Sequence, residues 1–378
     1  MIVLQDLNTV ISRVKDGRGG PGSFQTPAFT GEPARGSGKT RPLIVPIFIS
    51  HSGCPHRCVF CDQEQITSHS RGAMGADQVR ETLKKATDSP TFDRGRNPEV
   101  AFYGGTFTGL GKEKMKELLE AASPFIEDGD FTAVRVSTRP DFIHEEGLSV
   151  MKALHVKTVE LGVQSLDQEV LLRSRRGHTA GDVVRAVKML KESGFRVGMQ
   201  LMPGLPGDSR DRFLATVERV MGLDPHMVRL YPALVIRQTG LARMWLEGSY
   251  EPLTLEEAVY QCAQAVSLLE RKSIPVIRIG LMISPSSLEK GRILAGPWHP
   301  AFGFLVRSAI YHQGIAPDLP AHGTLRRIRL YVREGEVPII RGYKNRGIGM
   351  IEEKTGAKVL GIGTDNTLPP GRVRFCEL

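Results

Sequence analysis

From residue 41 onward, short runs of apolar and β-branched residues alternate with stretches in which apolar residues recur every three or four positions. The first pattern is typical of buried strands and the second of amphipathic helices, so the alternation predicts strand–helix units around a parallel sheet. The predicted strands are 43–50, 99–105, 132–140, 157–165, 196–204, 227–235 and 274–280. The predicted helices are 76–88, 112–124, 144–154, 179–193, 209–222 and 254–271. Six or seven such units make an α/β fold, a partial or complete (β/α) barrel.

Three residues near the predicted helix starts, Asp77, Thr179 and Thr254, carry oxygens that satisfy free backbone amides. Residues 1–40 differ from the rest, because they are rich in Gly, Pro, Ser and Thr and predict a flexible N-terminal segment. The barrel is expected over 41–280. In 281–378 the alternation weakens and then returns as a strand–helix–strand signal from 324 to 363, which predicts a barrel closure followed by a small α+β module.

Length and composition narrow the class of protein. The chain has 378 residues, enough for one large domain and a smaller one. Its 40% hydrophobic and 24% charged residues are those of a folded globular protein. No apolar run reaches the roughly 18 residues of a membrane span, and the N-terminus lacks a signal-peptide pattern, so we expect a cytoplasmic protein without a membrane partner. The net charge of +9 favours a polyanionic partner such as RNA.

Three of the five cysteines, Cys54, Cys58 and Cys61, lie within the stretch "HSGCPHRCVFCDQEQ". An odd, clustered set does not fit a disulfide framework and indicates a metal site. Zinc is one interpretation, with a fourth ligand from His51, His56 or His69. The interpretation we favour is a 4Fe–4S cluster with one iron left open for a substrate or cofactor, which explains why there are three cysteines.

The remaining cysteines, Cys262 and Cys376, are isolated and read as small hydrophobic residues. The CxxxCxxC spacing, with an aromatic residue directly before the third cysteine and a predicted strand before the loop, resembles the signature of the radical S-adenosylmethionine (SAM) enzymes. Further stretches resemble the subfamily that includes the catalytic subunit of the Elongator complex. They are "FYGGTF" (102–107), "STRPD" (137–141), "LGVQS" (161–165), "RSRRGHT" (173–179), "MQLMPGLPGD" (199–208) and "YPALVIRQTGLARMWLEGSYEP" (231–252).

This resemblance covers residues 41 to about 280 and implies a barrel of the radical SAM type. It implies a 4Fe–4S cluster held by the three cysteines, with SAM at the unique iron and an electron donor such as flavodoxin or ferredoxin. It also implies SAM-binding residues, which are Phe60, Gly104, Gly105, Thr106, Arg139, Gln164, Ser165, Arg176 and Met202.

Other roles stay open for several of these residues. The alternative is a helix N-cap for Gln164 and Ser165, a surface ion pair for each arginine and core packing for Met202. Tyr231 is a further candidate on the substrate side, although a buried tyrosine with a satisfied hydroxyl is the ordinary alternative.

The Elongator subunit has an acetyl-CoA-dependent acetyltransferase domain after its barrel, and we expect none here, because 281–378 shows no such signature. The Elongator reaction is therefore not transferred. We expect a radical SAM enzyme acting on an RNA (tRNA-like) substrate. The alternatives are a relative of oxygen-independent coproporphyrinogen oxidase acting on a small molecule, and a non-catalytic, cluster-containing RNA-binding protein.

The C-terminal segment carries two further signals. The stretch "GPWHPAFGFLVRS" (296–308) is expected to close the barrel mouth or to pack as a loop. Residues 337–362 predict a strand, a basic loop, a helix and a strand, and they resemble a KH RNA-binding fold. Four residues separate Gly342 from Gly347, where a KH loop has two, and a solvated cap on the barrel is the alternative.

Overall fold

The computed structural model describes residues 42–62, 74–281 and 291–378. The predicted N-terminal segment 1–40 and the candidate zinc ligand His69 lie outside these residues. Within them, no helix combines the length and the apolar composition needed to cross a lipid bilayer.

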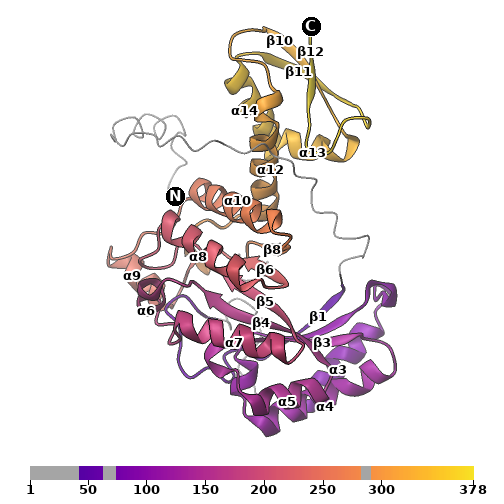
Figure 1. Ribbon diagram of the computed structural model, residues 1–378, viewed down its shortest axis with the longest axis vertical. Helices are drawn as coiled ribbons and strands as arrows, with labels where there is room; N and C mark the ends of the chain where they lie inside the picture. The colour runs from indigo at the N-terminus through magenta and orange to yellow at the C-terminus, as the bar shows by residue number, and fades with distance from the viewer. Residues whose placement is uncertain (1–41, 63–73, 282–290) are drawn as a thin grey trace. The chain divides into compact units, whose positions relative to one another are not determined.

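A curled parallel sheet of seven strands organises the residues before 282 (Figure 1). Its spatial order is β1-β2-β3-β4-β5-β6-β8, so each strand lies beside the next one in the chain apart from the short β7. All seven predicted strands are confirmed, as β1 (Ile44–Phe48), β2 (Glu99–Tyr103), β3 (Ala133–Thr138), β4 (Val156–Gln164), β5 (Arg196–Leu201), β6 (Met227–Leu230) and β8 (Val276–Ile279). In the described part of the chain β1 and β8 do not pair with each other, so the sheet is a partial barrel, open between them.

Helices follow the strands and lie on the outer side of the curled sheet (Figure 1). The six predicted helices are confirmed, as α3 (Ala76–Thr87), α4 (Lys112–Glu127), α5 (Glu145–Ala153), α7 (Ala180–Glu192), α8 (Arg210–Leu223) and α10 (Leu255–Arg271). The sequence did not predict the short helices α6 (Gln168–Arg173) and α9 (Gly240–Leu246). Thr179 and Thr254 cap α7 and α10 as expected. Asp77 does not cap α3, because the cap position is Gly75.

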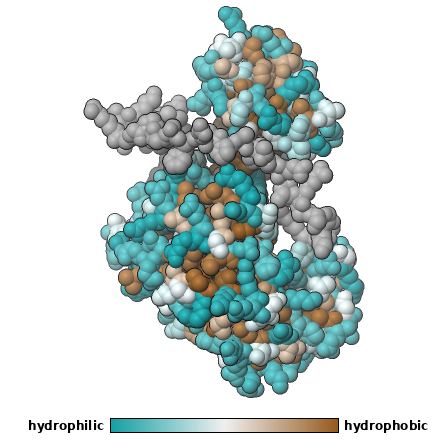
Figure 2. All heavy atoms as spheres, viewed as in Figure 1, coloured by the Kyte–Doolittle hydropathy of each residue, from teal (hydrophilic) through white to brown (hydrophobic). Residues whose placement is uncertain are grey.

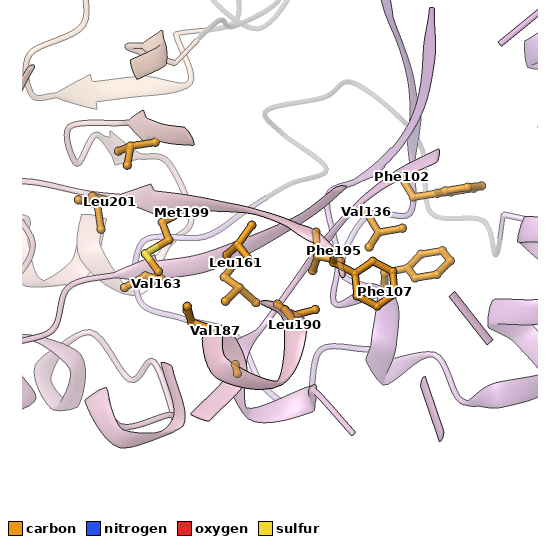
Figure 3. Close-up of a cluster of buried hydrophobic side chains, with 14 of the residues drawn as sticks. Phe102, Phe107, Val136, Leu161, Val163, Val187, Leu190, Phe195, Met199 and Leu201 are labelled. Carbon is orange, nitrogen blue, oxygen red and sulfur yellow. The ribbon is translucent and has the colours of Figure 1, made fainter. Parts of the chain in front are cut away.

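The main hydrophobic core lies between the sheet and these helices. Figure 3 shows side chains from β2 to β5 meeting residues of α7 in this layer, among them Phe102, Leu161, Val187 and Leu190. Strands buried on both faces need apolar residues at successive positions, which explains the continuous apolar runs in the sequence. Figure 2 shows hydrophobic residues gathered in the middle of the barrel part of the view, with hydrophilic residues around them.

The segment after residue 290 forms helix α12 and a small three-stranded sheet. Its elements are β9 (Ile293–Ala295), α12 (Phe302–Ile315), β10 (Arg327–Val332), α13 (Val337–Arg341), α14 (Arg346–Thr355), β11 (Lys358–Thr364) and β12 (Arg374–Glu377). The central strand β10 pairs in parallel with β11 and antiparallel with β12, and a separate hydrophobic cluster lies beneath this sheet. β9 pairs instead with β7 (Val235–Ile236).

The strand–helix–strand signal at 324–363 is confirmed as β10, α14 and β11. The strand predicted to begin at residue 337 is wrong, because residues 337–341 form the helix α13. Pro338 stands in the first turn of this helix, where its fixed φ suits helical geometry and its missing N–H costs nothing. The basic loop therefore joins two helices.

Candidate active site

A cavity of about 500 Å³ opens on the inner side of the curled sheet and is lined by residues from all seven strands. Eleven of the twelve residues predicted to bind the cluster or SAM line it: Cys54, Cys58, Phe60, Cys61, Gly104, Gly105, Thr106, Arg139, Gln164, Arg176 and Met202. Tyr231 and the two described candidate zinc ligands, His51 and His56, line it as well. Ser165 is not among the lining residues, and its hydroxyl accepts a hydrogen bond from the Asp167 amide at 3.0 Å.

The cysteine loop is held against the glycine turn that follows β2. His51 N–H donates to Gly104 O at 2.9 Å, and Thr106 N–H donates to Ser52 O at 2.9 Å. A Cβ on Gly105 would lie 2.4 Å from Ser52 O and 2.6 Å from Ile49 O, so a side chain there would displace backbone. The glycine therefore permits close packing of the two loops. A side chain at Gly105 would therefore disturb the cysteine loop before it reached any molecule in the cavity.

The three thiols lie close enough to affect one another. Burial, followed by the neighbouring Cys58 and Cys54, raises the pKa of the Cys61 thiol to about 12. Cys54 Sγ lies 3.2 Å from Thr106 Oγ1, and Arg176 Nη1 lies 3.4 Å from Cys58 Sγ. A metal centre at this position must therefore displace the proton of the buried Cys61 thiol.

Two arginines that line the cavity, Arg139 and Arg176, differ in how they are held. Asp141 binds Arg139 in a bidentate pair, with distances of 2.9 and 2.7 Å. Arg176 has no carboxylate partner among the described residues, and its Nη2 donates to Gly162 O at 2.6 Å. The Nε of Arg176 is buried without a hydrogen-bond partner. Such an orphan donor is costly unless a ligand satisfies it, so Arg176 is suited to receive an anionic group in the cavity.

Gln164 and the loop after β5 complete the opposite wall. Gln164 has a positive φ of 66°, which is costly for a residue with a side chain, and its Oε1 accepts from Gln200 Nε2 at 3.2 Å. Met202 lines the cavity. The turn after it is fixed by Tyr250, whose hydroxyl donates to Gly204 O at 2.6 Å. These contacts give the wall a defined shape.

A buried charged network at the cavity wall was missed from the sequence. Glu160 Oε1 accepts from Arg135 Nη1 at 2.7 Å and from Tyr103 Oη at 3.2 Å, and it lies 2.9 Å from Arg229 Nη2. Arg135 also pairs with Glu99 at 2.6 Å. Glu160 and Arg229 each stand between two apolar neighbours in their strands. A charge at such a position is rarely buried without a partner, so the sequence did contain a signal.

Comparisons with known proteins agree with this geometry. Residues 48–220 match the family model of the radical SAM superfamily, and residues 225–312 match the model of the radical SAM C-terminal domain. The two matches follow each other along the chain and cover the cavity walls. The chain belongs to the radical SAM superfamily of enzymes.

Within this superfamily, the chain resembles the radical SAM part of the Elongator catalytic subunit, as the sequence motifs predicted. It is 35% identical over 265 residues to a tRNA uridine(34) acetyltransferase of Methanocaldococcus infernus, covering 60% of this chain and 50% of that protein. It is 30% identical over 191 residues to human Elongator complex protein 3, covering 45% and 35%.

A solved structure of the Methanocaldococcus infernus Elp3, with an N-terminal deletion, has the same fold, with a TM-score of 0.56. Its sequence identity to this chain is 26%, and the match covers 73% of this chain and 64% of that one. The chain spans about half the length of the curated tRNA acetyltransferases that it matches.

Proposed function

We propose that this enzyme holds a 4Fe–4S cluster at Cys54, Cys58 and Cys61, binds SAM beside it and modifies an RNA substrate, specifically a tRNA base. The observation that carries the proposal is the cavity that the three thiols share with Gly104, Arg176 and the other predicted SAM-binding residues. When bound, the cluster and SAM supply reductive cleavage of the SAM sulfonium and a 5'-deoxyadenosyl radical that abstracts hydrogen from the substrate. An electron donor such as flavodoxin or ferredoxin would supply the electron.

The arrangement of the thiols supports a cluster over a single zinc ion. Within residues 42–62, 74–281 and 291–378, no three His, Cys, Asp or Glu side chains come together closely enough to hold one metal ion. The three thiols instead line a shared cavity. A cluster in which each thiolate binds a different iron needs ligands further apart than the ligands of one zinc ion do.

The chain's own residues would bind and orient SAM. Arg176 brings a guanidinium to the Cys58 sulfur and has a buried Nε without a protein partner, as a SAM carboxylate requires. Arg139 is held rigidly by Asp141, so it would position a ligand without losing side-chain freedom. The backbone of Gly104 and Gly105 lies on the cavity wall without a Cβ in the way.

The choice of RNA as substrate is supported by charge and by the relatives, which include tRNA uridine(34) acetyltransferases. Residues 321–378 contain eleven Lys and Arg and six Asp and Glu, a net charge of +5. Lys344 in the loop between α13 and α14 and Arg346 at the start of α14 are exposed, and neither forms an ion pair among the described residues. Basic side chains at an exposed loop are suited to phosphate contacts, as in the KH fold that this segment resembles.

The cluster is tested by reconstituting the chain anaerobically and measuring iron content and 5'-deoxyadenosine release with dithionite. Cys54→Ala, Cys58→Ala and Cys61→Ala should each lose iron and SAM cleavage, while Cys376→Ala, in the separate C-terminal sheet, should retain both. Full iron loading of Cys58→Ala would contradict the site.

The RNA substrate is tested by mass spectrometry of nucleosides from tRNA incubated with the active enzyme. SAM cleavage without any changed nucleoside would contradict an RNA substrate and favour a small molecule. The loop is tested separately with the double variant Lys344→Glu, Arg346→Glu, which should weaken tRNA binding and flatten its salt dependence. The control, Arg326→Glu with Lys354→Glu, makes the same charge change elsewhere in the segment. Equal weakening by both pairs would reject a specific role for the loop.

A further inference from the structure

The end of the cavity formed by β6 and β8 carries an arginine pair that the proposed chemistry does not use. The register of these parallel strands places Arg229 opposite Arg278. Residues opposite each other in a sheet direct their side chains to the same face, and both arginines line the cavity. Two like charges in register destabilise a sheet unless other charges compensate them.

Among the described residues, only Arg229 of this pair has its positive charge offset by a carboxylate. Arg229 is paired with Glu160 at 2.9 Å, and its Nη2 donates to Tyr103 Oη at 2.6 Å. Its Nε is nevertheless buried without a hydrogen-bond partner. Arg278 is exposed, and its side chain has neither an ion-pair partner nor a hydrogen bond among the described residues. The pair therefore keeps unused donors and uncompensated positive charge.

A tyrosine hydroxyl lies beside Arg229, and most charged side chains that line the cavity are positive. Tyr231 lies two residues after Arg229, so it faces the same side of the strand, and its Oη lies 3.5 Å from Arg229 Nη1. Among the described residues that line the cavity, Glu160 is the sole carboxylate. The lining contains five arginines: Arg57, Arg139, Arg176, Arg229 and Arg278. The thiolates of a cluster would offset positive charge near Arg176, which contacts Cys58, whereas among the described residues no contact joins Arg229 or Arg278 to a thiol.

We propose that Arg278 and Arg229, with the Tyr231 hydroxyl, bind an anionic group of the substrate, either a phosphate ester or a carboxylate. This inference rests on the proposed function only in naming the bound molecule as the substrate. Guanidinium groups bind both anions through paired hydrogen bonds, which fix orientation as well as charge. The site would hold the substrate at the open edge of the sheet with its reacting carbon directed towards SAM.

The first test measures protection of Arg278 from the arginine reagent phenylglyoxal, by peptide mass spectrometry. The full chain is reconstituted with its cluster and saturated with SAM, and the probes are inorganic phosphate and acetate at constant ionic strength with chloride. A probe at about four times its Kd should slow labelling of Arg278 about fivefold. Arg271, exposed at the end of α10 and outside the cavity lining, should label at an unchanged rate.

The same experiment identifies the source of the anion. Stronger protection by phosphate indicates a phosphate ester, and stronger protection by acetate indicates a carboxylate; either supports the site. Equal slowing of Arg271 and Arg278 would overturn the proposal, because it would reflect general ion binding. Protection seen in enzyme prepared without SAM but absent from the SAM-saturated enzyme would also overturn it, because the arginine would then belong to the SAM site.

A second measurement, calorimetric titration of the same probes, uses variants. Arg278→Gln should bind them roughly tenfold more weakly than wild type, Arg278→Lys should recover part of the loss, and Arg271→Gln should bind like wild type. Equal affinity in wild type and Arg278→Gln would overturn the site. Failure of the proposed function looks different, since wild-type enzyme would then release no 5'-deoxyadenosine whatever the probes do.

Discussion

Replacing Glu160 by glutamine should destabilise the barrel far more than replacing a surface carboxylate. Glu160 is 5% exposed and lies within hydrogen-bonding or ion-pair distance of Arg135, Arg229 and Tyr103. Removing one partner of a buried ion pair costs about 3–5 kcal/mol, because the other charge stays buried without compensation. In the Glu160→Gln variant, Arg135 keeps its ion pair with Glu99, and the glutamine side chain keeps one oxygen that accepts hydrogen bonds. We therefore expect the lower end, about 3 kcal/mol in the free energy of unfolding.

The assay is urea unfolding of the cluster-free protein, followed by circular dichroism. The control is Glu169→Gln, which breaks the exposed pair with Arg173 at 2.6 Å and should cost at most about 0.5 kcal/mol. Adding Arg229→Gln to Glu160→Gln should recover part of the loss, since it removes the charge left uncompensated. A loss below about 1 kcal/mol for Glu160→Gln would refute the view that this network holds the cavity wall.

Two further predictions follow from the walls of the cavity. Gly105→Ala should lower iron loading and lower the free energy of unfolding by about 1–3 kcal/mol, because its Cβ would meet backbone of the cysteine loop. The control Gly222→Ala, which has free space around it, should change neither quantity, and equal iron content in both variants would contradict the packing. Burial, with Arg176 and Arg139 nearby, lowers the pKa of His178 from 6.5 to about 3. As the pH falls, His178 is therefore protonated in the unfolded chain before it is protonated in the folded chain, and the folded state loses stability between pH 6.5 and about 3. Between pH 7 and 5 wild type should therefore lose about 2 kcal/mol relative to His178→Gln in urea unfolding, and parallel pH profiles would contradict a neutral, buried His178.

The strands and main helices were predictable because buried parallel strands and amphipathic helices leave strong periodic patterns. Segment 337–341 was not, because three apolar residues beside a proline fit either a strand or the first turn of a helix, and only the absence of a strand partner decides between them. Motifs predicted the cysteines, Gly104 and Arg176 as site residues, and the structure places them around one cavity. Arg278 was missed, since a single arginine at a strand end carries no pattern until the register places Arg229 beside it.

The contact between the cysteine loop and the turn after β2 has a consequence for moving this kind of site into another protein. The ligand-bearing loop takes its shape from Gly104, Gly105 and Thr106 about as much as from its own residues. A copied cysteine stretch would supply the three sulfur atoms but not the turn after β2 that holds the loop in its shape. The transferable unit is thus two strands with both of their following loops, and we expect a graft of the first loop alone to bind iron poorly.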